Sequence, residues 1–184
     1  AIADQDQIYG VITANASNHS GHTSAYSMPS SKAYLELLEK TFASAECDPS
    51  SINYVEAAAN GSPIGDQIEF KALSDFYKPY LKGEKITIGS VKANLGHLEA
   101  ASGISQLIKV LLQFKYKKMA PSINHQPLNA QIKIAQSPFV INEELRDWTE
   151  TTSKKLRAGI GSFGAGGSNV YLVLENHLAQ KATQ

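Results

Sequence analysis

The chain has 184 residues, of which 42% are hydrophobic, and this is ordinary for one domain with a buried core. Its 17 basic and 17 acidic side chains give a formal net charge of +0, which excludes a whole-chain field that attracts nucleic acid or an anionic membrane. No apolar stretch approaches the roughly 20 residues that span a bilayer, and residues 1–7 lack the pattern of a signal peptide. We therefore expect a cytoplasmic protein with neither a nucleic-acid nor a membrane partner.

The single cysteine, Cys47, excludes an internal disulfide and a cysteine-based metal cluster. It lies in the segment A-E-C-D-P-S-S, where no neighbour supplies the base or cation that activates a thiolate. We predict a thiol at a loop or helix end, and not a nucleophile. His19 and His22 are three residues apart in a predicted loop without a third ligand, so no metal site is predicted.

Short apolar runs alternate with stretches of helical periodicity along the chain. The predicted strands are residues 8–14, 52–57, 86–91, 139–141, 158–162 and 170–174. The predicted helices are residues 31–42, 67–80 and 98–114, the first of them capped by Ser30 or Ser31. This alternation predicts an α/β fold whose strands are largely buried.

The loops carry the usual turn residues. Residues 15–31 have the Asn, Ser, His, Gly and Pro content of a loop, and a glycine-rich turn at 164–167 precedes the last strand. We assign residues 1–176 to one domain and residues 177–184 to a C-terminal tail or linker.

Two segments carry the strongest functional signal. Residues Tyr54 to Asp66 read Y-V-E-A-A-A-N-G-S-P-I-G-D, and Ser90 to Gly103 read S-V-K-A-N-L-G-H-L-E-A-A-S-G. Both resemble signatures of the ketosynthase (β-ketoacyl synthase) domains of polyketide synthases, members of the thiolase superfamily. The first family signature runs V-E-A-H-G-T-G-T-x-x-G-D, and its active-site histidine falls on Ala58. The second family histidine is retained as His97.

Further motifs extend the resemblance over nearly the whole chain. They are N-H-S-G-H-T at 18–23, P-F-V-I-N-E-E-L-R-D-W at 138–148 and R-A-G-I-G-S-F-G-A-G-G-S-N-V-Y at 157–171. Their style is that of modular polyketide synthases served by free-standing acyltransferases. The resemblance implies the C-terminal half of a thiolase-like layered α-β-α-β-α fold, whose first half holds the nucleophilic cysteine. The chain would then be a fragment or one piece of a split ketosynthase, and its start near the boundary between the halves favours the split.

In a complete ketosynthase, an acyl chain passes from the phosphopantetheine of a carrier protein to the cysteine, and a malonyl unit is then decarboxylated. Two histidines stabilise the resulting enolate, and losing one such donor costs about two to three orders of magnitude in rate. By resemblance, His97 is the remaining donor, Lys92 is the family's lysine and Glu99 is its acidic partner. The alternative for Lys92 and Glu99 is a buried ion pair that orders the loop. Ala58 implies that condensation is lost.

The resemblance also places other residues around the active site. Phe163 and Gly164 border the nucleophile, and Ala165 stands where family members carry a phenylalanine gate. Asn60 offers an amide that could replace the lost donor. The expected partners are the N-terminal half with its cysteine, an acyl carrier protein and a second copy of the complete domain, with no cofactor bound directly.

Three functions follow as hypotheses. The first is a non-elongating ketosynthase that transfers an acyl chain without condensation, since thioester exchange needs only the nucleophile. The second is a structural or docking half-domain. The third is a condensing enzyme rescued by Asn60.

Overall fold

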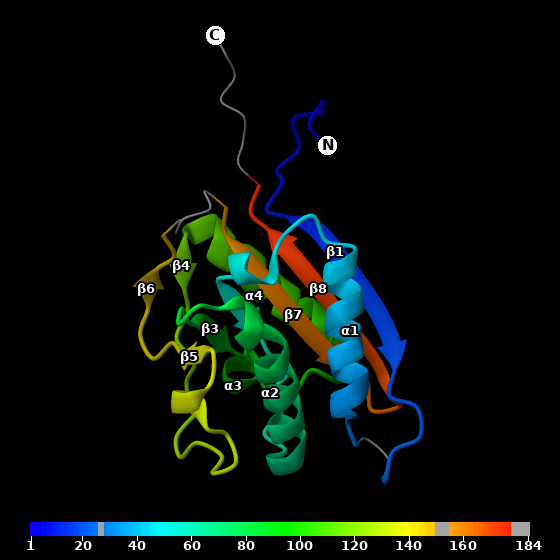
Figure 1. Cartoon of the computed structure of the whole chain (residues 1–184). Coiled ribbons are helices and arrows are strands. Elements are labelled where there is room, and N and C mark those ends of the chain that lie inside the picture. Colours follow the sequence, from blue (N-terminus) through cyan, green and yellow to red (C-terminus); the bar gives the residue numbers. More distant parts are fainter. Residues whose placement is uncertain (26–27, 150–154, 178–184) are drawn as a thin grey trace.

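The computed structural model describes residues 1–25, 28–149 and 155–177. Its centre is a six-stranded sheet in the order β1-β8-β7-β2-β3-β5 (Figure 1). Its strands are β1 (Val11–His19), β2 (Tyr54–Glu56), β3 (Ile86–Gly89), β5 (Phe139–Ile141), β7 (Arg157–Phe163) and β8 (Ser168–Glu175). β2 is parallel to β3 and β7, β3 is parallel to β5, and β8 is antiparallel to β1 and β7. The predicted α/β class is therefore confirmed.

Helices cover both faces of this sheet (Figure 1). The α-helices are α1 (Ser31–Ala43), α2 (Pro63–Tyr77), α3 (Lys92–Leu95) and α4 (Ser102–Tyr116). Short 3-10 turns are η1 (Pro49–Ser51), η2 (Lys78–Tyr80), η3 (Glu99–Ala101) and η4 (Ile134–Gln136), and β4 (Lys118–Met119) pairs with β6 (Arg146–Asp147) in a small second sheet. α1 and α2 pack on one face of the large sheet and α4 packs on the other.

The central strand β2 shows how the two cores are built. Successive side chains of a strand point to opposite faces, so Val55 packs in the α1–α2 core and Tyr54 in the α4 core. Tyr54 lies against Trp148, with ring centroids 5.5 Å apart. All residues of β2 and β3 are buried, which confirms the predicted burial for these two parallel strands.

Capping residues fix where two helices begin. The Ser30 hydroxyl accepts a hydrogen bond from the Ala33 N–H, which confirms the predicted cap of α1. The Ser62 hydroxyl accepts from the Gly65 N–H, and Pro63 occupies the first turn of α2. α2 therefore begins before the predicted residue 67.

Other predicted boundaries are also wrong. The loop predicted from Asn15 begins instead as strand, because β1 continues to His19 and pairs with β8. Ala14 and Ala16 of β1 are buried, while polar side chains lie on the outer side of this edge strand. The helix predicted over 98–114 is divided into η3 and α4, and α3 precedes them. Gly96, with φ +78°, ends α3. The predicted tail lies outside the described residues except for His177.

The outer side of α4 carries an exposed apolar stripe. Ile104, Ile108, Leu112 and Tyr116 are spaced four residues apart, so they lie on one helical face, and they are 54%, 50%, 44% and 63% exposed. No helix among the described residues is long and apolar enough to cross a membrane. A contiguous apolar face of this kind is typical of a surface that another polypeptide covers.

We predict that Ile104→Ser combined with Ile108→Ser reduces self-association of the isolated chain, because the pair removes the centre of the stripe. Sedimentation velocity measures this. Leu145→Ser, which removes a 66% exposed side chain outside the stripe, is the matched control and should leave self-association unchanged. A wild-type chain that sediments as a monomer would contradict the prediction.

Candidate active site

A cavity of about 350 Å3 opens at the carboxyl ends of the parallel strands, the usual place for ligands in α/β sheets. Ala58 follows β2, His97 lies between α3 and η3, and Phe163 ends β7. The described lining includes most residues predicted for the site: Ala58, Asn60, His97, Glu99, Phe163, Gly164 and Ala165. Lys92 is not among the lining residues. Residues that the sequence reasoning missed include Tyr34, Asp66 and Glu69.

The orientation of His97 fixes which ring nitrogen carries the proton. Its Nδ1 accepts a hydrogen bond of 3.0 Å from the Glu99 N–H, and the Ser102 hydroxyl lies 3.2 Å from the same nitrogen. A nitrogen that accepts from a backbone N–H carries no proton, so the neutral ring holds its proton on Nε2. His97 thus has one N–H to donate.

Ala58 lies in a loop whose backbone N–H groups bond to a buried carboxylate. Glu69 accepts hydrogen bonds from the Ala58 N–H at 2.7 Å and the Ala59 N–H at 2.8 Å. Burial raises the pKa of Glu69 to about 7, against the opposing effect of the two N–H donors. Ala58 itself adds only a methyl group to the cavity lining, so the loop is well ordered but donates nothing from this side chain.

Ala59 adopts a backbone conformation that favours glycine. Its φ is +31°, and the family signature has glycine at this position. A Cβ in this region clashes with the backbone, which costs about 1–2 kcal/mol. Glu69 holds Ala59 in place by accepting from its N–H and from the N–H of the preceding residue, Ala58.

The alternative for Lys92 and Glu99, a buried ion pair that orders the loop, is wrong. The Glu99 side chain is exposed, and the Glu99 N–H donates a hydrogen bond to His97 Nδ1. No ion pair joins Glu99 to Lys92. Lys92 is half-buried, and this burial lowers the pKa of its ammonium although the carboxylates of Glu69 and Glu56 oppose the shift. The role of Lys92 in catalysis stays a prediction.

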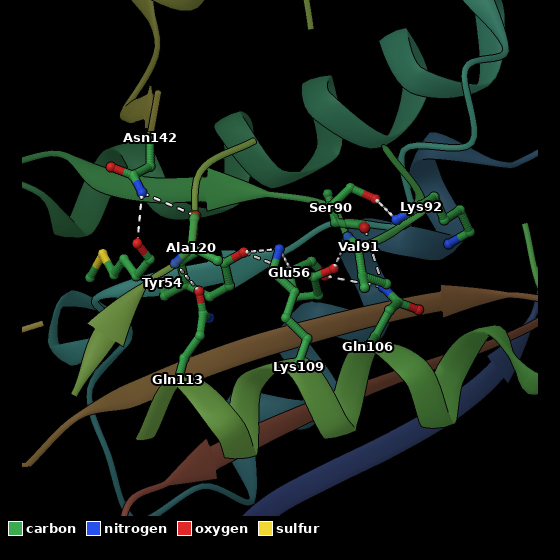
Figure 2. A network of polar contacts seen from close by, with 12 residues as sticks. Tyr54, Glu56, Ser90, Val91, Lys92, Gln106, Lys109, Gln113, Ala120 and Asn142 are labelled. Carbon is green, nitrogen blue, oxygen red and sulfur yellow. Dashed lines mark hydrogen bonds and ion pairs between the residues drawn. The ribbon is translucent and has the colours of Figure 1, made fainter. Parts of the chain in front are cut away.

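The buried ion pair of this region joins Glu56 and Lys109, with Oε2 and Nζ 2.8 Å apart (Figure 2). Glu56 also accepts from the Tyr54 hydroxyl and from the Val91 N–H. The sequence carries a signal for this pair, because Glu56 is a charged residue inside an apolar strand and Lys109 one in an apolar helix. Neither Glu56 nor Lys109 is among the residues predicted for the site.

Gln106 links α4 to the end of β2 and to β7 by hydrogen bonds. Its amide nitrogen donates to the carbonyl oxygens of Ala57 at 3.2 Å and Gly161 at 2.9 Å (Figure 2 shows the side chain). The side chain is fully buried. It therefore fixes the strand ends from which the cavity loops leave.

The glycine-rich turn is held by its own backbone and by His19. Gly164 N–H donates to the Ser168 carbonyl, and His19 Nε2 lies 2.9 Å from the Gly166 carbonyl. His19 Nδ1 accepts from the Gly21 N–H, so Nε2 is the donor. This arrangement places Ala165 at the cavity.

Cys47 lies outside the cavity lining, and burial raises the pKa of its thiol, which opposes activation. Among the described residues, no group of three His, Cys, Asp or Glu side chains is arranged to hold a metal ion.

Comparison with known proteins identifies the family. The β-ketoacyl synthase C-terminal domain profile matches residues 9–126. The chain belongs to this family. It is 45% identical over 185 aligned positions to the polyketide synthase PksR of Bacillus subtilis (strain 168), covering 97% of the chain and 7% of that protein. It is 39% identical to PksL of the same organism, covering 96% of the chain and 4% of that protein.

Solved ketosynthases share the fold. The ketosynthase from module 6 of the bacillaene synthase of Bacillus subtilis 168 superimposes with a TM-score of 0.93 at 35% identity, covering 97% of this chain and 32% of the solved one. The oxazolomycin ketosynthase domain OzmH KS7 of Streptomyces albus JA3453 gives 0.93 at 34% identity, covering 100% and 33%. The fold is therefore that of the C-terminal half of a thiolase-like ketosynthase of a modular polyketide synthase, and the chain spans about a third of the solved ketosynthases.

We predict that Ala59→Gly stabilises the chain by about 0.5–1 kcal/mol, because glycine relieves the strain at φ +31° and the gain exceeds the entropy it adds to the unfolded state. Ala72→Gly, in the interior of α2, is the matched control and should destabilise by about 1 kcal/mol. Urea unfolding followed by the fluorescence of the single, buried Trp148 measures both. Equal destabilisation by the two variants would contradict the strain at Ala59.

We predict that Glu69 makes the chain less stable as pH rises. Its pKa is about 7 in the folded chain and 4.5 ordinarily, so the folded state binds the proton more tightly. The stability that this proton contributes is complete below about pH 4.5 and is lost as pH rises through about 7, with a slope of at most about 1.4 kcal/mol per pH unit.

The same Trp148 unfolding assay, repeated between pH 4.5 and 7.5, tests this slope. Glu69→Gln should flatten it, whereas Glu36→Gln, which changes an exposed side chain on α1, should leave it unchanged. A slope that persists in Glu69→Gln would assign the effect to another group.

Proposed function

We propose that this chain is the C-terminal half of a non-elongating ketosynthase, which passes an acyl chain between carrier proteins without decarboxylative condensation. The observation that carries the proposal is the methyl group of Ala58 at the cavity, where the family signature has a histidine. Among the described lining residues, His97 is the one histidine.

The chemistry of the two steps explains why acyl transfer is kept and condensation is lost. Transfer of an acyl group between thiols requires a nucleophilic cysteine and a donor for the thioester oxygen, and His97 Nε2–H supplies such a donor. Condensation additionally builds an enolate, whose oxygen needs the donor missing at Ala58. Loss of one such donor reduces the rate about 100-fold to 1000-fold.

The partners follow from the same proposal. An N-terminal half supplies the nucleophilic cysteine and covers the exposed stripe of α4 formed by Ile104, Ile108, Leu112 and Tyr116. Carrier proteins bring the acyl chain on phosphopantetheine, while this half binds no cofactor of its own. The complete domain works as a homodimer in the cytoplasm, and Lys92 supports the charge at the active site.

Asn60 supports a second candidate function, a condensation-competent ketosynthase. It lines the same cavity, and its side-chain oxygen accepts from the Ser62 N–H at 2.9 Å, so the amide nitrogen is the group left to donate. To rescue condensation, the Asn60 amide would have to reach the place that an imidazole on residue 58 would occupy. A purely structural half-domain is the third candidate.

We predict that the complex with a matching N-terminal half transfers acyl groups to a carrier protein but forms no detectable β-ketoacyl product from malonyl carrier protein. Intact-mass spectrometry measures both, with the acyl group on the partner half's cysteine. Cys47→Ser is the control, because this thiol lies outside the cavity and its replacement should leave loading unchanged.

Each outcome selects one candidate. Transfer without extension supports the proposal, and Ala58→His should then restore a trace of condensation. Robust β-ketoacyl formation that Asn60→Ala abolishes selects the Asn60 enzyme, and absence of any loading selects the structural half-domain.

A further inference from the structure

His97 lies in a short segment between two helices. α3 ends at Gly96, His97 follows directly, and η3 then leads into α4 at Ser102. Among the described residues, the His97 ring forms hydrogen bonds only within this segment, from the Glu99 N–H at 3.0 Å and with the Ser102 hydroxyl at 3.2 Å. The direction of its Nε2–H therefore depends on where α3 and α4 place the segment.

The backbone of this segment does not keep its shape unaided. Glu99 has a φ of +50°, a left-handed conformation that residues other than glycine adopt at a cost. Such a conformation persists where the surrounding structure fixes it. The contacts that hold the two flanking helices are therefore decisive for His97.

One oxygen of Glu56 fixes the helix before His97. Glu56 Oε1 accepts a hydrogen bond of 2.5 Å from the Val91 N–H, and both residues are buried (Figure 2). Val91 is the residue before α3, and its carbonyl accepts from the Asn94 and Leu95 N–H groups. The start of α3 is thereby joined to the end of β2.

The other oxygen of Glu56 fixes the helix after His97. Glu56 Oε2 accepts from Lys109 Nζ at 2.8 Å, and the Lys109 and Glu56 side chains are 10% and 0% exposed (Figure 2). Lys109 lies on α4 about two turns from Ser102, the residue of that helix that contacts His97 Nδ1. Because a carboxylate accepts at both oxygens, one side chain holds the helices on either side of His97.

We propose that Glu56 is the positioning residue of His97, acting through Val91 and Lys109 to direct the Nε2–H into the cavity that His97 lines. This inference rests on the proposed acyl transfer, in which that N–H donates to the thioester oxygen. Stability alone does not account for the pair, because apolar residues of similar volume often replace a buried ion pair without loss. Glutamine is no substitute either, since it offers one acceptor oxygen where several donors converge.

Two variants release the flanking helices one at a time. Glu56→Gln combined with Lys109→Met removes both buried charges and the link to α4, while the glutamine oxygen still accepts from the Val91 N–H. Glu56→Asp keeps the charge but shortens the side chain. The flexible Lys109 side chain follows the shorter carboxylate, whereas the backbone N–H of Val91 does not.

The matched control removes an ion pair elsewhere in the chain. Glu175→Gln combined with Arg157→Met deletes a pair of 2.8 Å at the first residue of β7, outside the cavity lining. Its side chains are 12% and 15% exposed, so the control also removes two largely buried charges.

Nitrogen NMR of isotope-labelled histidine reads the His97 ring in the complex with the N-terminal half, and His97→Gln identifies its signals. At about pH 9, where imidazoles with ordinary pKa values are neutral, the wild-type ring should show a protonated Nε2 and an unprotonated Nδ1. In both Glu56 variants the two nitrogen shifts should move toward each other, because the ring no longer keeps one tautomer. The control pair should keep the wild-type shifts.

Acyl transfer supplies a second readout. A misdirected donor should lower kcat about 10-fold to 100-fold and leave KM unchanged, because the acyl chain still binds in the same cavity. The control pair should leave both constants unchanged even where it lowers stability.

A single Nε2–H tautomer that persists in a folded Glu56 variant, or an equal change in the control pair, would overturn the positioning role. Where one Glu56 variant fails to fold, the other decides. The tautomer is read without acyl transfer, so a complex that transfers nothing refutes the proposed function and leaves this test intact.

Discussion

The carboxylate of Glu56 is the constraint on which the site depends. It is fully buried, and an unpaired charge at such a position costs several kcal/mol. Three donors satisfy it: the Tyr54 hydroxyl within β2, the Val91 N–H after β3 and the Lys109 ammonium on α4 (Figure 2). The Glu56 side chain therefore links β2 and β3 to α4, at the ends of the strands where the cavity begins.

This tie explains how the site can lose a catalytic group and keep its shape. Ala58 follows Glu56 by two residues, and its loop is held through backbone N–H groups that bond to Glu69. His97 is positioned separately, through the Glu99 N–H. Neither arrangement uses a side chain at position 58, so replacing an imidazole there by a methyl changes what the cavity donates and leaves the surrounding loops supported.

The sequence was sufficient for the elements whose signal is local. Periodicity and caps gave α1, β2 and β3, and the motifs brought Ala58, His97 and Phe163 to one cavity, as the structure has them. Long-range contacts could not be predicted from the sequence. The extension of β1 to His19 depends on pairing with β8, more than a hundred residues away in sequence, and the partners of buried charges depend on which helix crosses which strand. Lys92 was paired with the wrong residue for that reason.

The polar wall of the cavity argues against a purely structural role. Buried polar groups that lack protein partners lower stability, and real proteins keep such local conflicts mainly at functional sites. Phenylalanine at position 34 would preserve the contact with Phe163 without burying an unpaired hydroxyl. Glycine at position 59 would remove the strain that Glu69 now supports. Tyr34 and Ala59 both belong to the cavity lining, so these local conflicts favour a site that still receives a substrate.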